Sequence, residues 1–285
     1  MNRNGKNYQV AVVVPIYRKF TELSANEADA LRQIAKVLHG REIFFIYPPT
    51  IDPAEYIRFL EPLVARAVKV PSKFFGNLER NNRMLVSHSF YRHFAAFDYM
   101  LLHHTDAYVF SDQLDYWCGQ DLDYIGAPWF EGKKDPVMPL KFVGVGNGGF
   151  SLRRISSFLK VTANRPFILK YFIFTRVYTF LHGHHYKAVR KYSGIDYLMA
   201  YLRSNIGYED EFWGLVVPRF FRWFKVAKPE EALKFSFEVM PEVLLKLNNN
   251  ELPFGCHAWE KYDPVFWKSF IPYNASNSHQ QNTTI

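Results

Sequence analysis

The sequence of 285 residues has few features of a membrane-spanning or disulfide-stabilised protein. Its only two cysteines, Cys118 and Cys256, form neither a disulfide framework nor a Cys-x-x-Cys motif. No apolar run reaches the roughly 18 residues that a transmembrane helix needs. Residues 1–9 are polar, and the apolar run after them is too short for a signal peptide. We therefore expect a cytoplasmic protein with reduced thiols.

The chain also lacks any run of five or more Lys or Arg residues, although its formal net charge is +8. A spread positive charge of this kind argues against a nucleic-acid partner, which would select a basic patch or stripe. It favours a smaller anionic partner, such as a nucleotide diphosphate, or an anionic lipid surface.

Both common glycine-rich phosphate motifs are absent. The glycines at 144, 146, 148 and 149 lie close together, but their spacing is not that of a dinucleotide fingerprint, and no terminal GK[ST] follows. Such glycines let a ligand approach the backbone closely, although they could equally form a tight turn between strands. Beside them, Asn147 could bind sugar hydroxyls, and Arg153 could meet a phosphate.

Aromatic residues are abundant, at 18% of the chain. Flat aromatic faces stack on the apolar faces of sugars, so the excess suits a carbohydrate ligand. A large aromatic core would explain it as well. We expect Trp129 and Trp213 to offer such faces to a sugar acceptor.

Alternating elements open the chain. Residues 10–16 (VAVVVPI) form a β-branched run typical of a buried parallel strand. After it, the pattern predicts helices at 22–38 and 53–63 and strands at 42–47 and 67–70. This β-α-β-α-β order predicts an α/β protein with a doubly wound sheet.

The remainder continues one domain, because neither a repeat nor a linker interrupts it. Further elements are expected as a helix at 81–97, a strand at 99–104 continued at 108–110, and strands within 123–126, 141–152, 223–226 and 235–238. The domain is expected over residues 1–273, with a disordered tail at 274–285.

Residues 165–192 are basic and aromatic with almost no acids. They could form a packed helical insertion whose cations reach solvent, or a helix on an anionic membrane surface. We therefore keep open a peripheral contact with a membrane.

Asp106 follows an apolar strand, where open α/β sheets hold ligand chemistry. Its carboxylate could bind Mn²⁺ or Mg²⁺, or simply cap the strand end. His257 is a candidate second ligand. The neighbouring His103 and His104 alternate across the strand, so only one of them can face a site.

Three consecutive acids, Glu209, Asp210 and Glu211, precede Trp213. A sugar hydroxyl that attacks an anomeric carbon needs a carboxylate base, and Asp210 or Glu209 could supply it. The same acids would also favour the first turn of a helix.

Seven blocks occur in a fixed order and together resemble a known family: VVVPIYR, LLHHTDAYVF, DYIGAPWF, VGNGGFSLR, YEDEFW, FSFE and LPFGCHAW. The family consists of GT-A-like proteins, long catalogued as a domain of unknown function and found among bacterial surface-polysaccharide genes. The resemblance covers about residues 9–268. It implies a GT-A (Rossmann-like) fold, a mixed sheet flanked by helices, that binds a nucleotide-sugar donor.

The resemblance also assigns places in a site. Pro15, Ile16 and Tyr17 would lie by the nucleotide base. The junction of donor and acceptor would be lined by Gly148 and Gly149. Asp106 would occupy the Asp-x-Asp position, near a metal or the ribose. Glu209 and Asp210 would fall at the catalytic acid position, and His257 at the late metal-ligand position.

We therefore expect a hexosyltransferase-like enzyme that moves a sugar from a UDP-sugar to a glycan or lipid-linked glycan, with inversion and with Asp210 as base. The Asp-x-Asp place departs from the pattern, since Ala107 and Tyr108 follow Asp106. Two alternatives stay open: a non-catalytic glycan- or nucleotide-binding module, and a metal-dependent phosphodiesterase or nucleotidyltransferase.

Overall fold

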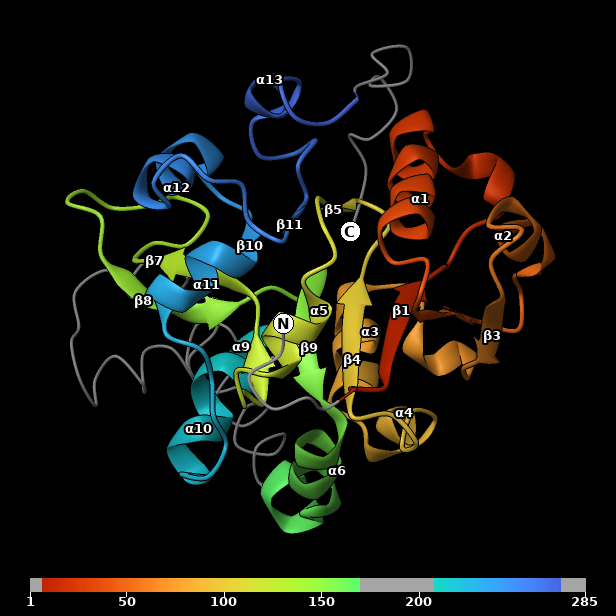
Figure 1. Cartoon of the computed structure of the whole chain (residues 1–285). Helices are drawn as coiled ribbons and strands as arrows, with labels where there is room; N and C mark the ends of the chain where they lie inside the picture. Colours follow the sequence, from red (N-terminus) through yellow and green to blue (C-terminus); the bar gives the residue numbers. More distant parts are fainter. Residues whose placement is uncertain (1–6, 170–207, 273–285) are drawn as a thin grey trace.

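The computed structural model describes residues 7–169 and 208–272, and its centre is a six-stranded mixed sheet (Figure 1). The strand order is β3-β2-β1-β4-β9-β6, in which β1 to β4 are parallel and β9 runs antiparallel to both neighbours. The strands are β1 (Val10–Pro15), β2 (Glu42–Tyr47), β3 (Ala65–Lys69), β4 (Tyr99–His103), β6 (Tyr124–Ile125) and β9 (Phe150–Arg154). The expected mixed sheet flanked by helices, in a single domain, is confirmed.

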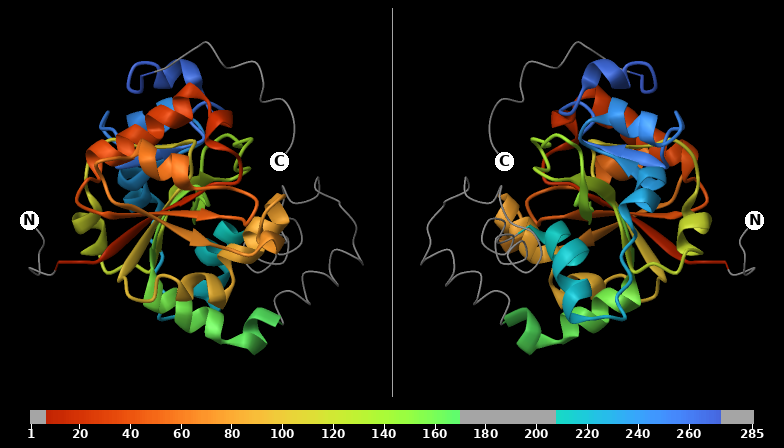
Figure 2. Two further views of the ribbon diagram at one scale, coloured as in Figure 1. Left: turned by 90° about the vertical axis from the view of Figure 1, so that its right-hand side faces the viewer. Right: turned by 90° about the vertical axis from the view of Figure 1, so that its left-hand side faces the viewer.

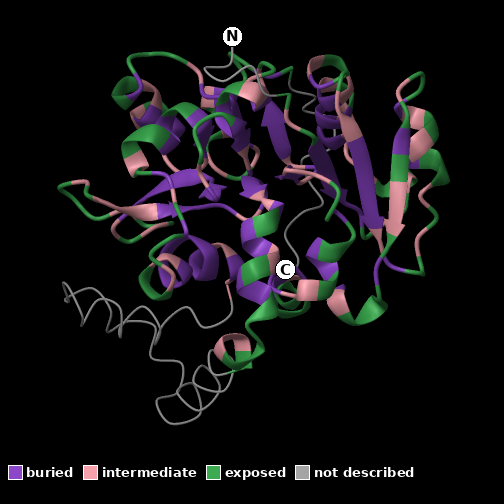
Figure 3. Ribbon diagram, turned by 60° about the horizontal axis from the view of Figure 1, so that its bottom comes forward, coloured by how far each residue is buried: buried purple, intermediate pink, exposed green. Residues whose placement is uncertain are grey.

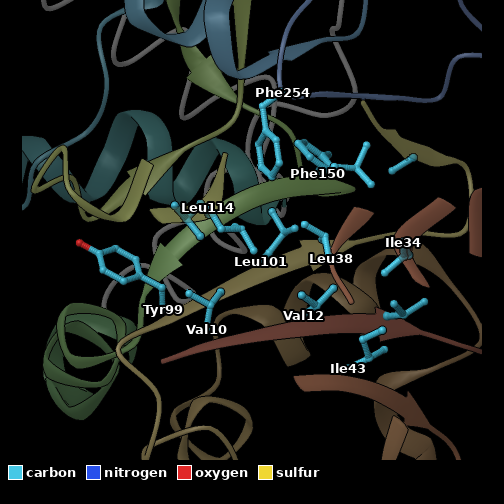
Figure 4. Close-up of a cluster of buried hydrophobic side chains, with 14 of the residues drawn as sticks. Val10, Val12, Ile34, Leu38, Ile43, Tyr99, Leu101, Leu114, Phe150 and Phe254 are labelled. Atoms are coloured by element: carbon cyan, nitrogen blue, oxygen red, sulfur yellow. The ribbon is translucent and has the colours of Figure 1, made fainter. Parts of the chain in front are cut away.

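Strand β1 is buried along its whole length, because helices cover both faces of the sheet. Val10, Val12 and Val14 pack against α1 (Ala25–Val37) and α2 (Ala54–Phe59), and Figure 4 shows part of this cluster. Ala11 and Val13 face the other side. Figure 2 shows the sheet between these two layers.

The second layer contains α3 (Leu78–Leu85), α4 (His88–Arg92) and α6 (Ile155–Ala163). The prediction of a single helix at 81–97 is wrong. The chain leaves α3 at Val86, and the hydroxyl of Ser87 then accepts a hydrogen bond from the Phe90 amide and caps a new helix. Buried residues line these inner faces, and exposed ones lie outside (Figure 3).

A small second sheet lies beyond the carboxyl end of β4 and has the order β10-β11-β5. Its strands are β10 (Ser236–Phe237), β11 (Gly255–His257) and β5 (Ala107–Val109). The expectation that 108–110 continue β4 is therefore wrong, because the chain turns at Thr105 and Asp106 and pairs with β11 instead. The antiparallel register sets His257 opposite Ala107.

A hairpin of β7 (Ala127–Phe130) and β8 (Phe142–Gly146) completes the strands. The strand expected at 223–226 is reduced to a bridge between Val226 and Tyr124. The other helices are η1 (Phe20–Glu22), η2 (Ser72–Phe74), α5 (Leu114–Cys118), α9 (Glu209–Glu211), the π-helix η4 (Phe212–Val216), α10 (Val217–Phe220), α11 (Pro229–Phe235), α12 (Pro241–Leu247) and α13 (Pro264–Trp267).

Two sequence expectations fall largely or wholly outside the described residues. Of the basic and aromatic stretch 165–192, only residues 165–169 are described, and the tail at 274–285 is not described. Within the described parts of the chain, none of the helices combines the length and the apolar character that crossing a membrane requires.

Candidate active site

The turn after β4 separates two neighbouring histidines. His103 is fully buried, with its ring against Phe150 and its Nδ1 2.8 Å from the carbonyl oxygen of His104. His104 lies instead beside His257, with ring centroids 5.6 Å apart. Only His104 of this pair therefore belongs to the site.

The pairing of β5 with β11 brings His257 to Asp106. Its Nε2 lies 3.3 Å from Asp106 Oδ1, and its Nδ1 lies 3.2 Å from Glu238 Oε1. His104, Asp106 and His257 each offer a ligand atom within 4.8 Å of the others. We call these three residues and Glu238 the strand-end cluster.

Burial and the neighbouring carboxylates set the protonation of the two histidines of the cluster. Burial alone would lower the pKa of His257, but the carboxylates of Asp106 and Glu238 outweigh it and raise this pKa to about 10. Burial lowers the pKa of His104 to about 4. The pKa of the Asp106 carboxyl is depressed: burial would raise it, but His257 dominates. His104 is thus a neutral ligand at physiological pH.

The cluster fits a divalent metal ion. His104 Nε2 is buried and has no hydrogen-bond partner, which is costly unless a ligand satisfies it. Two imidazoles and a carboxylate form a nitrogen and oxygen donor set that suits first-row divalent metals. The sequence predicted Asp106 and His257 as ligands and left open which of His103 and His104 faces the site, whereas it did not point to Glu238. The His-x-Asp spacing could have pointed to His104.

The glycine-rich segment forms the turn between β8 and β9. Asn147 adopts φ 141°, and its Oδ1 accepts hydrogen bonds from the amides of Gly149 and Phe150 at 2.9 and 3.2 Å. Its side chain is buried. Its carbonyl oxygen holds the turn, but its Nδ2 has no hydrogen-bond partner among the described residues, so the expectation that Asn147 binds sugar hydroxyls stays a prediction that depends on Nδ2.

The turn lies between two sets of functional side chains. A Cβ at Gly149 would collide with the ring of His257. One at Gly148 would lie 2.7 Å from Glu209 Oε1. The two adjacent glycines therefore bring the strand-end cluster and the acidic segment as close together as the backbone allows.

Glu209 and Arg153 form a buried ion pair, with Arg153 NH2 2.9 Å from Glu209 Oε1. Arg153 also donates to Ser151 and to the Tyr91 hydroxyl. Its side chain is completely buried, so the expectation that it meets a phosphate is wrong. Glu209 is sealed in the same way, which argues against it as a base, and burial raises its pKa to about 7 against the opposing charge of Arg153.

Asp210 is only half-buried, unlike its neighbour. Its Oδ1 accepts a hydrogen bond of 2.9 Å from the Glu211 amide. Burial raises the pKa of Asp210, Lys133 opposes this and the charge of Glu238 adds to it. Because Glu238 also bonds His257, Asp210 is electrostatically coupled to the strand-end cluster.

Neither tryptophan presents an open face. Trp213 is completely buried against Phe158, with ring centroids 3.9 Å apart, and its Nε1 donates to the Leu85 carbonyl. The expectation that Trp213 stacks on an acceptor is wrong. Trp129 is 7% exposed and is covered by Lys133, whose ammonium lies 4.7 Å from the ring centroid. Trp129 therefore offers an acceptor little more than an edge.

The segment expected to hold the nucleotide base exposes one side chain. Pro15 and Ile16 are buried at the end of β1, whereas Tyr17 is 47% exposed. Burial raises the pKa of the Tyr17 hydroxyl, the charge of Arg18 opposes this, and the charge of Asp106 adds to it. Tyr17 is thus the member of this trio that can stack on a ligand.

Fold and site together define an α/β protein with a candidate metal and carboxylate site beyond the carboxyl end of a parallel strand. Residues 65–257 match the family model described as "Protein of unknown function (DUF5672)". The match covers more than half of the chain, so the protein belongs to this family. Every residue of the strand-end cluster, the glycine turn and the acidic segment lies within it. None of the curated proteins matches the chain.

Among solved structures, the chain is similar to apo glycosyltransferase GlyE of Streptococcus pneumoniae TIGR4, with 12% identity and a TM-score of 0.45 over 92% of this chain and 60% of that one. The chain thus spans less than two thirds of GlyE. The chain is also similar to apo mouse xyloside xylosyltransferase 1, with 10% identity and a TM-score of 0.49 over 86% of this chain and 96% of that one. A third similar structure is a glycosyltransferase involved in the glycosylation of the major capsid of PBCV-1, with 9% identity and a TM-score of 0.43 over 91% of this chain and 97% of that one. All three TM-scores are too low to carry an activity over to this chain.

Proposed function

We propose that this protein is a glycosyltransferase that moves a sugar from a nucleotide-diphosphate sugar to a hydroxyl of a glycan or lipid-linked glycan. The observation that carries the proposal is the pairing of a candidate metal cluster with a half-buried carboxylate, Asp210, coupled through Glu238. A UDP-sugar is the favoured donor, inversion the expected outcome, and glycan or polysaccharide biosynthesis in the cytoplasm the expected setting.

The strand-end cluster would hold Mn²⁺ or Mg²⁺ through His104, Asp106 and His257. A bound divalent ion would neutralise charge on the leaving diphosphate. Glu238 has an orienting role: its side-chain oxygen accepts a hydrogen bond from His257 Nδ1, which directs Nε2 toward Asp106.

Asp210 is the proposed base. It takes the proton of the acceptor hydroxyl as that oxygen bonds to the anomeric carbon, while the bond from this carbon to the diphosphate breaks and the nucleoside diphosphate leaves. A carboxylate whose pKa is raised by burial is a stronger proton acceptor at neutral pH. Gly148 and Gly149 would line the junction of donor and acceptor, and Tyr17 would stack on the base of the nucleotide.

The test is turnover of nucleotide sugars by the purified full chain. We would screen UDP-, GDP- and other nucleotide-activated sugars with glycan acceptors, with and without Mn²⁺, and measure release of the nucleoside diphosphate and formation of product. The expected result is turnover of at least one donor that Asp210→Asn abolishes. A wild-type chain that binds UDP in a thermal-shift assay but turns over no donor would support a binding module instead.

A further inference from the structure

An apolar surface joins the end of α6, the following residues 165–169 and α10. Leu169 is 60% exposed, Phe220 59% and Trp223 37%. The ring of Phe167 connects this surface, since its centroid lies 5.3 Å from that of Phe220 and 4.9 Å from that of Phe221. A cluster of large exposed apolar side chains marks an interaction site more often than a solvated surface.

Cations surround these apolar side chains. The ammonium of Lys160 lies 4.2 Å from the ring centroid of Trp223. Arg219 and Arg222 are exposed, and no carboxylate of a described residue pairs with either. The stretches 155–169 and 212–228 contain no Asp or Glu. We define the α6–α10 face by its six exposed residues: Lys160, Leu169, Arg219, Phe220, Arg222 and Trp223.

We propose that the α6–α10 face binds the surface of an anionic membrane. Exposed leucine and aromatic side chains insert at the boundary between headgroups and acyl chains, and Lys and Arg beside them meet anionic headgroups. Both halves of this chemistry are present on one face. A nucleic-acid duplex would use the cations but would leave Leu169 and Phe220 in water, and a single strand stacked on the rings would still leave Leu169 exposed.

The position of the face suits this partner. Strand β9 begins at the glycine turn of the candidate site and ends in α6, so the face and the strand-end cluster lie toward opposite ends of the sheet. In Figure 1, α6 and α10 lie at the bottom and β5 and β11 above. A membrane bound at the bottom leaves the strand-end cluster open to water. This inference does not depend on the proposed function.

Vesicle sedimentation tests the proposal. The full chain would be mixed with vesicles of phosphatidylcholine alone or with about 30% phosphatidylserine. We expect binding to the anionic vesicles only, weakened by salt. The double variant Arg219→Glu/Arg222→Glu should lower the partition coefficient at least about tenfold, since each cation near the surface strengthens binding. Phe220→Ser should lower it as well, and its residual binding should be more sensitive to salt.

The matched control is Arg58→Glu/Lys69→Glu, which makes the same change of charge at exposed positions on α2 and β3. It should bind anionic vesicles much more tightly than the Arg219/Arg222 variant does. Circular dichroism checks that both variants are folded. The proposal is wrong if the wild type does not bind anionic vesicles, or if the two double variants lose binding equally.

Discussion

The strand-end cluster and the Arg153–Glu209 pair lie on either side of Gly148 and Gly149, yet they differ in almost every physical respect. The Asp106 side chain is 43% exposed and that of His257 15%, whereas Arg153 and Glu209 are 0% and 2% exposed. Within the described parts of the chain, His104 Nε2 in the cluster and Glu209 Oε2 in the pair are both buried without a hydrogen-bond partner, but the cluster is partly open to solvent, whereas the pair is closed to it.

The difference shows that the adjacent acids Glu209 and Asp210 have different roles. A sealed ion pair joins β9 to α9 and holds the acidic segment in place, but it is closed to a substrate. Its neighbour Asp210 is half-buried and coupled to the cluster. Glu209 is therefore best read as an anchor and Asp210 as the chemical group. Substitutions on the two sides of the turn should separate stability from activity.

The largest effect is expected for Asp210→Asn. Removing a general base lowers kcat by about 10² to 10⁴-fold, whereas the melting temperature should hardly change because the amide keeps the side chain's shape. Steady-state transfer assays and thermal unfolding measure the two. Glu209→Gln is the matched control: it should leave kcat of the folded fraction near the wild-type value, because this carboxylate is closed to a substrate. A reversed pattern would exchange the roles we assign.

The second effect concerns stability. Arg153→Met should destabilise the protein by about 3–5 kcal/mol at pH 8, since it leaves the ionised Glu209 buried without its cation. Urea-induced unfolding measures this loss. Asp106→Ala should change the free energy of unfolding far less, because its carboxylate is partly solvated, but should abolish metal binding. Equal destabilisation by both variants would contradict the structural role of Arg153 and the metal-binding role of Asp106.

Much of the fold was predictable because its signals are local. The β-branched run of β1 and the alternation that follows specify parallel strands between helices without reference to distant residues. The break between α3 and α4 was missed, since a helical pattern passes through Ser87 and only its capping geometry ends the helix. The departure of β5 from β4 depends on pairing with β11, almost 150 residues later.

The site was predictable only where a residue's own position carried the signal. Asp106 follows a buried strand, and His257 belongs to an ordered block. Glu238 ends the ordered block FSFE, but its role could not be predicted, because it depends on the contact with His257. Trp213 and Arg153 look like ligand-binding groups in the sequence, since composition does not reveal that both point into the core.

The third prediction concerns alanine substitutions of the two glycines. Each should lower the free energy of unfolding by about 1–3 kcal/mol, because the added methyl group overpacks the turn. Gly149→Ala would push the ring of His257 out of place and should mainly weaken Mn²⁺ binding. Gly148→Ala would press on Glu209 and should mainly lower stability. Calorimetric titration with Mn²⁺ and thermal unfolding, applied to both variants, distinguish these outcomes. Identical profiles would show that the turn does not separate two environments.

A smaller effect is expected at Glu238. Loss of a carboxylate that orients a metal-binding histidine costs about 10 to 100-fold in metal affinity. Glu238→Ala should show this loss in Mn²⁺ titrations of the folded protein, and Glu238→Gln a smaller one, because an amide oxygen can still accept from His257. Glu242→Gln, an exposed acid paired with Lys246 on α12, is the control and should bind Mn²⁺ like the wild type. Unchanged affinity in Glu238→Ala would exclude the orienting role.

The smallest expected effect is the pH dependence of the stability that Glu209, in the buried pair with Arg153, contributes to the fold. The pKa of Glu209 is raised from 4.5 to about 7, so between these values the folded protein keeps a proton that the unfolded chain releases. Stability from this group is therefore present below pH 4.5 and is lost as the pH rises to 7, by about 1 kcal/mol between pH 5 and 6. Urea unfolding of wild type and Glu209→Gln at both pH values isolates this contribution, because the other titrating groups are common to both. The wild type should lose more stability than the variant over this interval; an equal or smaller loss would mean that Glu209 is already ionised at pH 5, with Arg153 overcoming its burial.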